Sequence, residues 1–415
     1  MDQAWLQVID RMEIEDAIRM RRVSPKMDLL VSKSLRSRKH LDIERDCPSA
    51  VHDPSAIASV IAQCSHNLRS IDLKIRRNQM FSTIPSNVEI RRKVMVAIIE
   101  NSNKLKKLHI DRCRLTTGAI ASFGDLPDTI EEVSITNSLI DCSEWEVATI
   151  IRKAFEMFFT KCRKLKFFEV SGRCLSSSHF HVDPSILRLM SDTVEHLAIA
   201  GSNLRINTLA FLKTKRLKTL ILQRSFISPT DLEYIVAMAN TITHLDLSFS
   251  VNLKDCQEIS KLKNLKHLSL TNNRDSVLDD SVALIARECL QLEELCLNDC
   301  SNLTPYSLIY LGELRNLYKL SLSGVPNVDD SVCQQIARCT KINFLELNLC
   351  RKVQKRGLQC LLSNLTALQH LEVIGIRDYS HQLLTTQLTH LKTIVCDDPI
   401  VRFSFTLPSA VPVSA

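Results

Sequence analysis

The chain of 415 residues is poor in glycine, with eight in total, and in aromatic residues, which make up 5% of it. Common nucleotide sites need glycine-rich turns whose backbone N–H groups surround phosphate, so this scarcity argues against such a site. Long apolar runs are also missing. Stretches such as 94–99 are far shorter than the roughly 20 apolar residues that a membrane-spanning helix needs. We therefore expect neither a nucleotide cofactor nor a membrane segment.

Signals for export and for catalysis are lacking as well. Residues 1–16 carry acidic side chains where a signal peptide has a basic and then an apolar stretch. The fifteen cysteines form no Cys-x-x-Cys pair, which favours reduced, packed thiols in a protein of the cytoplasm or the nucleus. No Gly-x-Ser-x-Gly, Gly-Lys-Ser or His-Glu-x-x-His motif occurs, and His179 and His181 have no ligand partners at metal spacing. We predict no catalytic residue, no metal site and no cofactor.

Aliphatic residues, in contrast, return in a regular pattern. The motif aliphatic-x-x-aliphatic-x-aliphatic starts at Leu68, Leu105, Ile130, Leu165, Val194, Leu217, Ile242, Leu265, Leu292, Leu317, Ile342, Leu368 and Leu391. Most intervals between starts fall within the roughly 20 to 29 residues of one class of repeat. Within each motif, the alternation of aliphatic and other residues has a period of two, which predicts a short strand with one buried and one exposed face. Helical spacing follows, as in 280–289 and 330–339, so each repeat is predicted to be strand, turn and helix.

Small or polar residues stand eight positions after many of the starts, among them Cys113, Asn273, Cys300 and Cys350. With this feature, residues 67–396 resemble leucine-rich repeat proteins of the cysteine-containing type. The resemblance implies an α/β fold: a right-handed horseshoe with parallel strands on the concave face and helices outside. We assign residues 46–396 to about 13 such repeats and 397–415 to a C-terminal cap and tail, with the boundaries of the long early repeats between 68 and 194 left open.

Residues 1–45 are predicted to form three short helices, the third of which starts at the capping pair Ser24-Pro25. From periodicity alone, these helices could simply cover the end of the repeat array. The segment also resembles an F-box in the order of its residues, which run Leu6-Gln-Val-Ile9-Asp-Arg-Met12-Glu-Ile14-Glu-Asp-Ala-Ile18 and then Arg-Arg-Val23-Ser-Pro-Lys-Met27. The resemblance implies that Leu6, Ile9, Met12 and Ile14 contact the Skp-family adaptor of a cullin-RING ubiquitin ligase. It also implies that Ile18, Val23 and Met27 hold the three helices together.

Exposed strand positions should line up from repeat to repeat, because neighbouring strands lie about 4.8 Å apart. Apolar groups in such a row are typical of a surface that binds a protein. His244 and His267 should be neighbours, and with His196 they could make binding sensitive to pH, although ordinary exposed histidines remain the alternative. The predicted partner-binding residues are Phe167, His196, Ile221, His244, His267, Glu294, Lys319 and Phe344.

These patterns support one leading hypothesis and two alternatives. The leading one is a substrate-recognition subunit of an SCF-type ubiquitin ligase, which performs no chemistry itself and binds an adaptor and a protein substrate. The first alternative is a repeat scaffold or inhibitor with no ligase link. The second, a nucleic-acid binder, relies on the basic stretch 19–39 and is weaker, because a net charge of +7 is modest and such residues usually form solvated helix faces.

Overall fold

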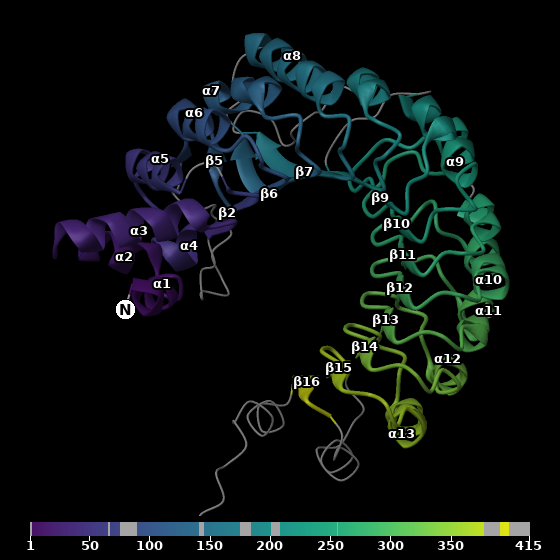
Figure 1. Ribbon diagram of the computed structural model, residues 1–415. Coiled ribbons are helices and arrows are strands. Elements are labelled where there is room, and N and C mark those ends of the chain that lie inside the picture. Colours follow the sequence, from purple (N-terminus) through teal and green to yellow (C-terminus); the bar gives the residue numbers. More distant parts are fainter. Residues whose placement is uncertain are drawn as a thin grey trace, which may run out of the picture. The chain divides into compact units, whose positions relative to one another are not determined.

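The computed structural model describes residues 2–64, 67–74, 89–140, 145–174, 184–200, 208–254, 256–376 and 391–397. The chain forms two compact units, which we call unit 1 (Met1–Asn203 with Thr214–Leu217) and unit 2 (Leu204–Lys213 with Lys218–Ala415). In each unit, parallel strands form a sheet that helices cover on one side (Figure 1). We call the other side of each sheet its open face. Among the described residues, no helix is both long and apolar enough to cross a membrane.

Unit 1 begins with the three predicted helices, α1 (Asp2–Ile9), α2 (Ile14–Met20) and α3 (Pro25–Ser37). Ser24 caps α3 as predicted, because its hydroxyl accepts a hydrogen bond from the backbone N–H of Met27 at 3.1 Å. The helices then lead into the sheet, whose main strands are, in spatial order, β1 (His40–Asp42), β2 (Ser70–Lys74), β4 (Lys107–Asp111), β6 (Glu132–Ile140), β7 (Phe167–Cys174) and β8 (His196–Ala200). The two-residue strands β3 (Glu89–Ile90) and β5 (Arg114–Leu115) pair beside them.

The covering helices of unit 1 are α4 (Ile43–Asp46), α5 (Pro54–Gln63), α6 (Arg92–Asn101), α7 (Thr117–Ala121) and α8 (Trp145–Lys161), with the 3-10 helices η1 (Ser122–Asp125) and η2 (Pro184–Leu189). Four buried phenylalanines join α8 to the sheet. Phe155, Phe158 and Phe159 of α8 surround Phe168 of β7, and the closest pair of ring centroids, Phe159 and Phe168, is 4.9 Å apart at 72°. Such edge-to-face packing makes this the densest aromatic part of the described core.

Unit 2 repeats a shorter strand and a shorter covering segment. Its strands are β9 (Thr219–Ile221), β10 (His244–Asp246), β11 (His267–Ser269), β12 (Glu294–Cys296), β13 (Lys319–Ser321), β14 (Phe344–Glu346), β15 (His370–Glu372) and β16 (Thr393–Val395). They pair in chain order and all in parallel. The helices are η3 (Thr208–Thr214), α9 (Pro229–Val236), η4 (Cys256–Lys261), α10 (Asp279–Glu288), α11 (Pro305–Leu308), η5 (Ile309–Glu313), α12 (Asp330–Ile336) and α13 (Lys355–Asn364).

Every one of the predicted repeat starts is followed, two residues later, by a strand. In the start at Leu292, for example, β12 begins at Glu294, and Leu292, Leu295 and Leu297 are all buried. The repeat prediction is therefore confirmed, and the shared interior of stacked repeats is the core.

The small or polar residues that stand eight positions after many of the starts have a structural role. The thiols of Cys113, Cys300 and Cys350 donate to the carbonyl oxygens of Leu73, Leu270 and Leu322 in the preceding repeat, at 3.2 to 3.3 Å. In another repeat the amide of Asn273 donates to the carbonyl of Leu247 in the preceding repeat and to that of Leu270 in its own repeat. Burial raises the pKa of the Cys300 and Cys350 thiols to about 12, so they are present as neutral donors.

One strand was not predicted. β1 pairs in parallel with β2, with Leu41 beside Ile71, and Leu41 and Ile43 are buried like the second and third aliphatic residues of a repeat. Arg38 occupies the position of the first aliphatic residue, which hides the motif. The sheet thus begins at His40, on the N-terminal side of the boundary that we drew at residue 45, and that boundary stays a prediction.

Candidate protein-binding surface

Two rows of side chains run across the open face of unit 2. The strand register aligns Thr219, His244, His267, Glu294, Lys319, Phe344 and His370 in the first row. In the second row it aligns Ile221, Asp246, Ser269, Cys296, Ser321, Glu346 and Glu372. Because the leucine between the two row positions of each strand points into the core, both rows face outward.

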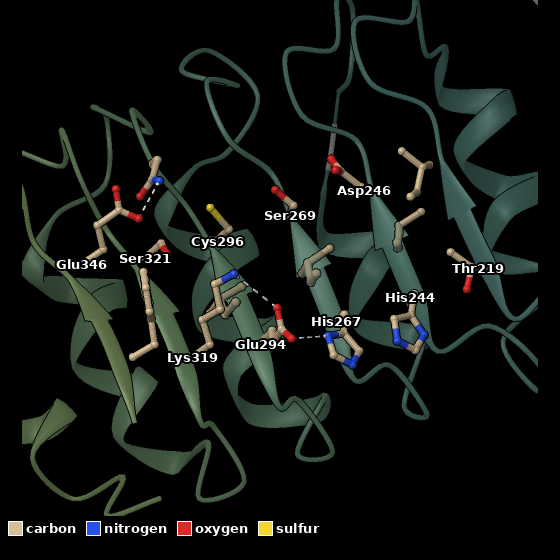
Figure 2. A pocket seen from close by; sticks show the side chains of 16 residues that line it. Thr219, His244, Asp246, His267, Ser269, Glu294, Cys296, Lys319, Ser321 and Glu346 are labelled. Atoms are coloured by element: carbon tan, nitrogen blue, oxygen red, sulfur yellow. Dashed lines mark hydrogen bonds and ion pairs between the residues drawn. The ribbon is translucent and has the colours of Figure 1, made fainter. Parts of the chain in front are cut away.

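The two rows line a groove with a volume of about 410 Å³. Six of the eight predicted partner-binding residues are part of its lining, namely Ile221, His244, His267, Glu294, Lys319 and Phe344. Figure 2 shows the first row along one side and the second row along the other. Residues beyond that prediction also line it, and they include Thr219, Asp246, Ser269, Cys296, Ser321 and Glu346. The volume lies in the range of ordinary ligand pockets and suits a short segment rather than a folded domain.

Glu294 contacts its neighbours on both sides in the first row. Its carboxylate lies 3.1 Å from Nδ1 of His267 and 3.7 Å from Nζ of Lys319, and both contacts are drawn in Figure 2. The hydroxyl of Tyr318 also donates to Glu294, and this hydrogen bond, with burial, raises the pKa of Tyr318 to about 12. Tyr318 was missed by the sequence analysis because it precedes the strand and reaches the carboxylate from outside the row.

Ring stacking joins other members of the first row. The rings of His244 and His267 lie 3.9 Å apart at 11°, which confirms the prediction that these residues are neighbours. Burial and the adjacent charge of His267 lower the pKa of His244. Further along, Nζ of Lys319 lies 5.3 Å from the ring centroid of Phe344, and Phe344 contacts His370 at 6.0 Å between centroids. The row is therefore an ordered surface of half-buried side chains.

The remaining two predicted residues lie in unit 1. Phe167 and His196 are partners in register on β7 and β8, and their rings stack at 3.8 Å and 5°. Both are half-buried. His196 thus belongs to a different unit from His244 and His267, and its ring packs on Phe167. Of the three histidines His196, His244 and His267, only His244 and His267 are in contact.

A charged cluster on the open face of unit 1 was not predicted. Nδ1 of His109 lies 2.8 Å from Asp72 and Nε2 lies 2.8 Å from Glu132, while Nζ of Lys107 lies 2.5 Å from Glu132. Contact with Asp72, reinforced by Glu132, raises the pKa of His109 against the effect of burial. Burial would raise the pKa of Asp72, but His109 and the nearby Lys74 and His40 lower it. Each residue was visible in the sequence, but only the register of β2, β4 and β6 brings them together.

The raised pKa of His109 makes a pH-dependent contribution to stability. The contribution should be complete below about 6.5, the ordinary histidine pKa, and should be lost as the pH rises through the higher pKa of the folded state. We expect His109→Gln to lower the free energy of unfolding by about 1–2 kcal/mol at pH 5.5 and by clearly less at pH 9. Urea unfolding at several pH values measures this, with the exposed His52→Gln as the control. A loss that is equal at both pH values would contradict the assignment.

In the N-terminal helices, the predicted adaptor contacts divide into two groups. Leu6 and Met12 are half-buried, whereas Ile9 and Ile14 are fully buried in the core and cannot contact a partner in this conformation. Hydrophobic packing between the helices explains the burial of Ile9, because α1 is in contact with α3 and Ile9 is the buried residue of α1. Val23, expected to hold the helices together, is 71% exposed. The expectation for Val23 was therefore wrong.

Other apolar side chains of these helices face solvent. Trp5 is 41% exposed and Val8 50% exposed on α1, and Leu29 of α3 is also exposed. Lys26 of α3 lies 2.7 Å from Asp2 of α1. Leu29 follows Lys26 by about one helical turn, and Trp5 follows Asp2 by the same interval, so Leu29 and Trp5 lie at a similar level on the two helices. We call Trp5, Val8 and Leu29 the apolar stripe. Large apolar groups exposed on neighbouring helices are candidates for a protein contact.

Several basic side chains of the stretch 19–39 have partners within the chain. Arg19 lies 2.8 Å from Glu15, and Arg21 lies 2.5 Å from Asp28. Arg38 donates at 2.7 Å to the carbonyl of Met12, beyond the end of α1. Basic side chains with such intramolecular partners are less available to phosphate groups, so these contacts weaken the nucleic-acid hypothesis.

Histidine and carboxylate side chains can also bind metal ions. His179 and His181 lie outside the residues that the structure describes. Among the described ones, His40, Asp42 and Asp72 place ligand atoms within 4.8 Å of one another. Asp42 caps α4, however, and Asp72 contacts His109, so ordinary structural roles account for both carboxylates.

No family model matches the chain. Two solved structures are similar to it over most of its length. A chain of the Rad7 and Elc1 complex of yeast aligns with 95% of this chain and 94% of its own length, at 16% identity and with a TM-score of 0.59. An internalin (inlF) from Listeria monocytogenes aligns with 86% of this chain and 97% of its own, at 14% identity and with a TM-score of 0.50. Together with the parallel strands and their covering helices, this likeness establishes the fold as an α/β leucine-rich repeat solenoid.

Proposed function

We propose that the protein is a substrate-recognition subunit of an SCF-type cullin-RING ubiquitin ligase, acting in the cytoplasm or the nucleus. The N-terminal helices, assigned to residues 1–45, would bind the Skp-family adaptor. The open faces within the repeat region, assigned to residues 46–396, would hold a protein substrate, and residues 397–415 would form the cap and tail. Ubiquitin transfer would be performed by other subunits, so the protein itself needs no catalytic residue.

The apolar stripe is the structural feature that supports adaptor binding. A tryptophan and two aliphatic side chains exposed on neighbouring helices have an energetic cost in water, and a partner that covers them removes it. Leu6 and Met12 are half-buried and can extend the same contact. The resemblance to an F-box supports an adaptor as that partner, and the yeast structure of similar fold is itself a complex of two proteins, Rad7 and Elc1.

The groove of unit 2 is the structural feature that supports binding of a protein substrate. Extended faces of this kind are the surfaces that solenoid proteins use for binding. Ile221, Phe344 and the stacked pair His244 and His267 offer apolar and aromatic area, while Glu294 and Lys319 offer charge. In unit 1, the stacked pair Phe167 and His196 offers a second aromatic area. A mixed lining of this kind matches the composition of protein interfaces.

The adaptor proposal is tested with the full-length protein as bait in extracts of cells that express it. Mass spectrometry of the captured proteins should find a Skp-family adaptor and a cullin. The double variant Trp5→Ser/Val8→Asp should reduce adaptor capture at least about tenfold, because it removes apolar contact area and adds a charge to the interface. Both positions are exposed, so the variant should keep the circular dichroism spectrum of the wild type.

Leu278→Asp in unit 2, at an equally exposed apolar residue, is the matched control and should capture the adaptor normally. If the wild-type protein captures substrate candidates reproducibly but no adaptor, the ligase proposal is rejected. The scaffold or inhibitor without a ligase link would then be the better description. Equal loss in both variants would mean that the apolar stripe is not the contact.

A further inference from the structure

The lining of the unit 2 groove carries more negative than positive charge. Asp246, Glu294 and Glu346 contribute carboxylates, and Lys319 contributes an ammonium group that already lies 3.7 Å from Glu294. Glu372 on β15 adds a carboxylate beside Glu346, its partner in register. A cation brought by another molecule would therefore enter a field that favours it.

Neutral donors hold two of these carboxylates. Asp246 accepts from the side-chain amide of Gln223 at 2.6 Å and from a backbone N–H at 2.9 Å. Glu346 accepts from the hydroxyl of Ser323 at 2.8 Å and from the amide of Asn298 at 3.4 Å. Within the described ranges, no ion pair joins either carboxylate to a cation. Since neutral donors orient a carboxylate without cancelling its charge, both groups are positioned acceptors that still lack a counter-ion.

The three lining carboxylates recur on every second strand. Asp246 lies on β10, Glu294 on β12 and Glu346 on β14. Strands about 4.8 Å apart put successive carboxylates about 10 Å from each other across the sheet, and Glu294, in the first row, is offset by two residues along its strand from Asp246 and Glu346 in the second row. A chain in the extended polyproline II conformation advances about 3.1 Å per residue and completes one turn in three residues, so every third side chain faces the same way and recurs after about 9 Å. The spacing fits an extended segment that carries a basic side chain at roughly every third position.

Apolar side chains stand at the carboxyl ends of the same strands. Phe249 follows Asp246 by three residues and Leu349 follows Glu346 by three, and both are exposed. Both also have left-handed backbone conformations, with φ of +58° and +63°. The equivalent position in other repeats, which is also left-handed, holds Arg224, Asn272, Asp299 or Gly324. The left-handed turn therefore belongs to the repeat itself. The guanidinium of Arg224 lies 4.8 Å from the ring centroid of Phe249, so Leu349, 48% exposed, is the apolar group open to a partner.

We propose that the unit 2 groove binds an extended, arginine- or lysine-rich segment of a protein partner, with its basic side chains on Asp246, Glu294 and Glu346 and an apolar side chain on Leu349. This inference rests on the proposed function, because it names the chemistry of the segment that the open face would hold. The same negative field disfavours nucleic acid and acidic segments in this groove.

The probe is a fluorescein-labelled peptide of nine residues, three repeats of Arg-Leu-Ser, measured by fluorescence anisotropy with the full-length protein. A peptide with Glu in place of each Arg tests the sign of the charge, and a peptide of the same composition with its arginines adjacent tests the spacing. The double variant Asp246→Asn/Glu346→Gln removes two charges but keeps the size of both side chains. Its matched control, Glu233→Gln/Asp280→Asn, removes two charges from exposed positions on the covering helices.

We expect the Arg-Leu-Ser peptide to bind more tightly than both other peptides, and binding to weaken as salt rises. The groove variant should bind at least about tenfold more weakly than the wild type, and the control variant within about twofold of it. Preference for the acidic peptide, equal binding of all three peptides, or equal losses in both variants would overturn the inference. Adaptor capture is measured separately from peptide binding. If the protein captures the adaptor but its groove does not bind the basic peptide, this inference is refuted and the ligase proposal is not.

Discussion

Replacing Phe168 with alanine should lower the free energy of unfolding by about 3–5 kcal/mol, which is the usual cost of removing a buried phenyl ring. Phe168 has no exposed surface and is surrounded by Phe155, Phe158 and Phe159 of α8. The deletion leaves a cavity among rings that are fixed between a helix and a strand, so the surrounding structure can collapse only in part. Urea or thermal unfolding measures the effect.

The neighbouring residue provides the control. Phe167 stands next to Phe168 on β7, but its side chain points to the open face, where it stacks on His196. Phe167→Ala should therefore cost only about 0.5–1.5 kcal/mol, the worth of one aromatic contact. Similar losses for the two variants would mean that the inward and outward positions of β7 are assigned incorrectly.

A second large effect is expected for the buried carboxylate of Asp231, at the start of α9. Asp231 is fully buried and accepts hydrogen bonds from the hydroxyl of Ser228 at 2.6 Å, from its backbone N–H at 3.1 Å and from the backbone N–H of Leu209 at 3.2 Å. Asp231→Ala leaves these donors without an acceptor in a place that water does not reach. We expect unit 2 to lose about 3–5 kcal/mol, measured by urea unfolding.

Asp329 serves the same purpose in an accessible place. It caps α12 by accepting from the backbone N–H groups of Ser331 at 3.0 Å and Val332 at 3.1 Å, and it is only half-buried. Because water can replace it, Asp329→Ala should cost about 1 kcal/mol. If Asp231→Ala were no worse than Asp329→Ala, burial would not be what makes the Asp231 cap important.

The strands and their facing could be predicted from the sequence because one physical rule fixes both. Leu295 and Leu320 must point inward for stacked repeats to share a core, so the residues on either side of each leucine point outward. The rows that contain His267, Glu294 and Lys319 followed from the same alternation. The neighbourhood of His244 and His267 was predictable for the same reason.

Features that depend on more than one repeat or on helix packing were not predictable. Arg38 at the first aliphatic position concealed β1. The helical spacing of Leu6, Ile9 and Met12 identified an apolar side of α1, but spacing alone cannot say whether that side faces the chain's own core or a partner. The core takes Ile9, and the exposed apolar stripe begins with Trp5. The cluster around His109 needs the register of β2, β4 and β6 before its charges can be seen together.

Within unit 2, each strand pairs only with the strands on either side of it. The width of the open face therefore changes only in steps of one whole repeat. Duplication of one complete repeat would widen the face by one strand, about 4.8 Å, and would leave all other strand pairs as they are. Gain or loss of whole repeats would therefore lengthen or shorten the open face without changing the packing inside the remaining repeats.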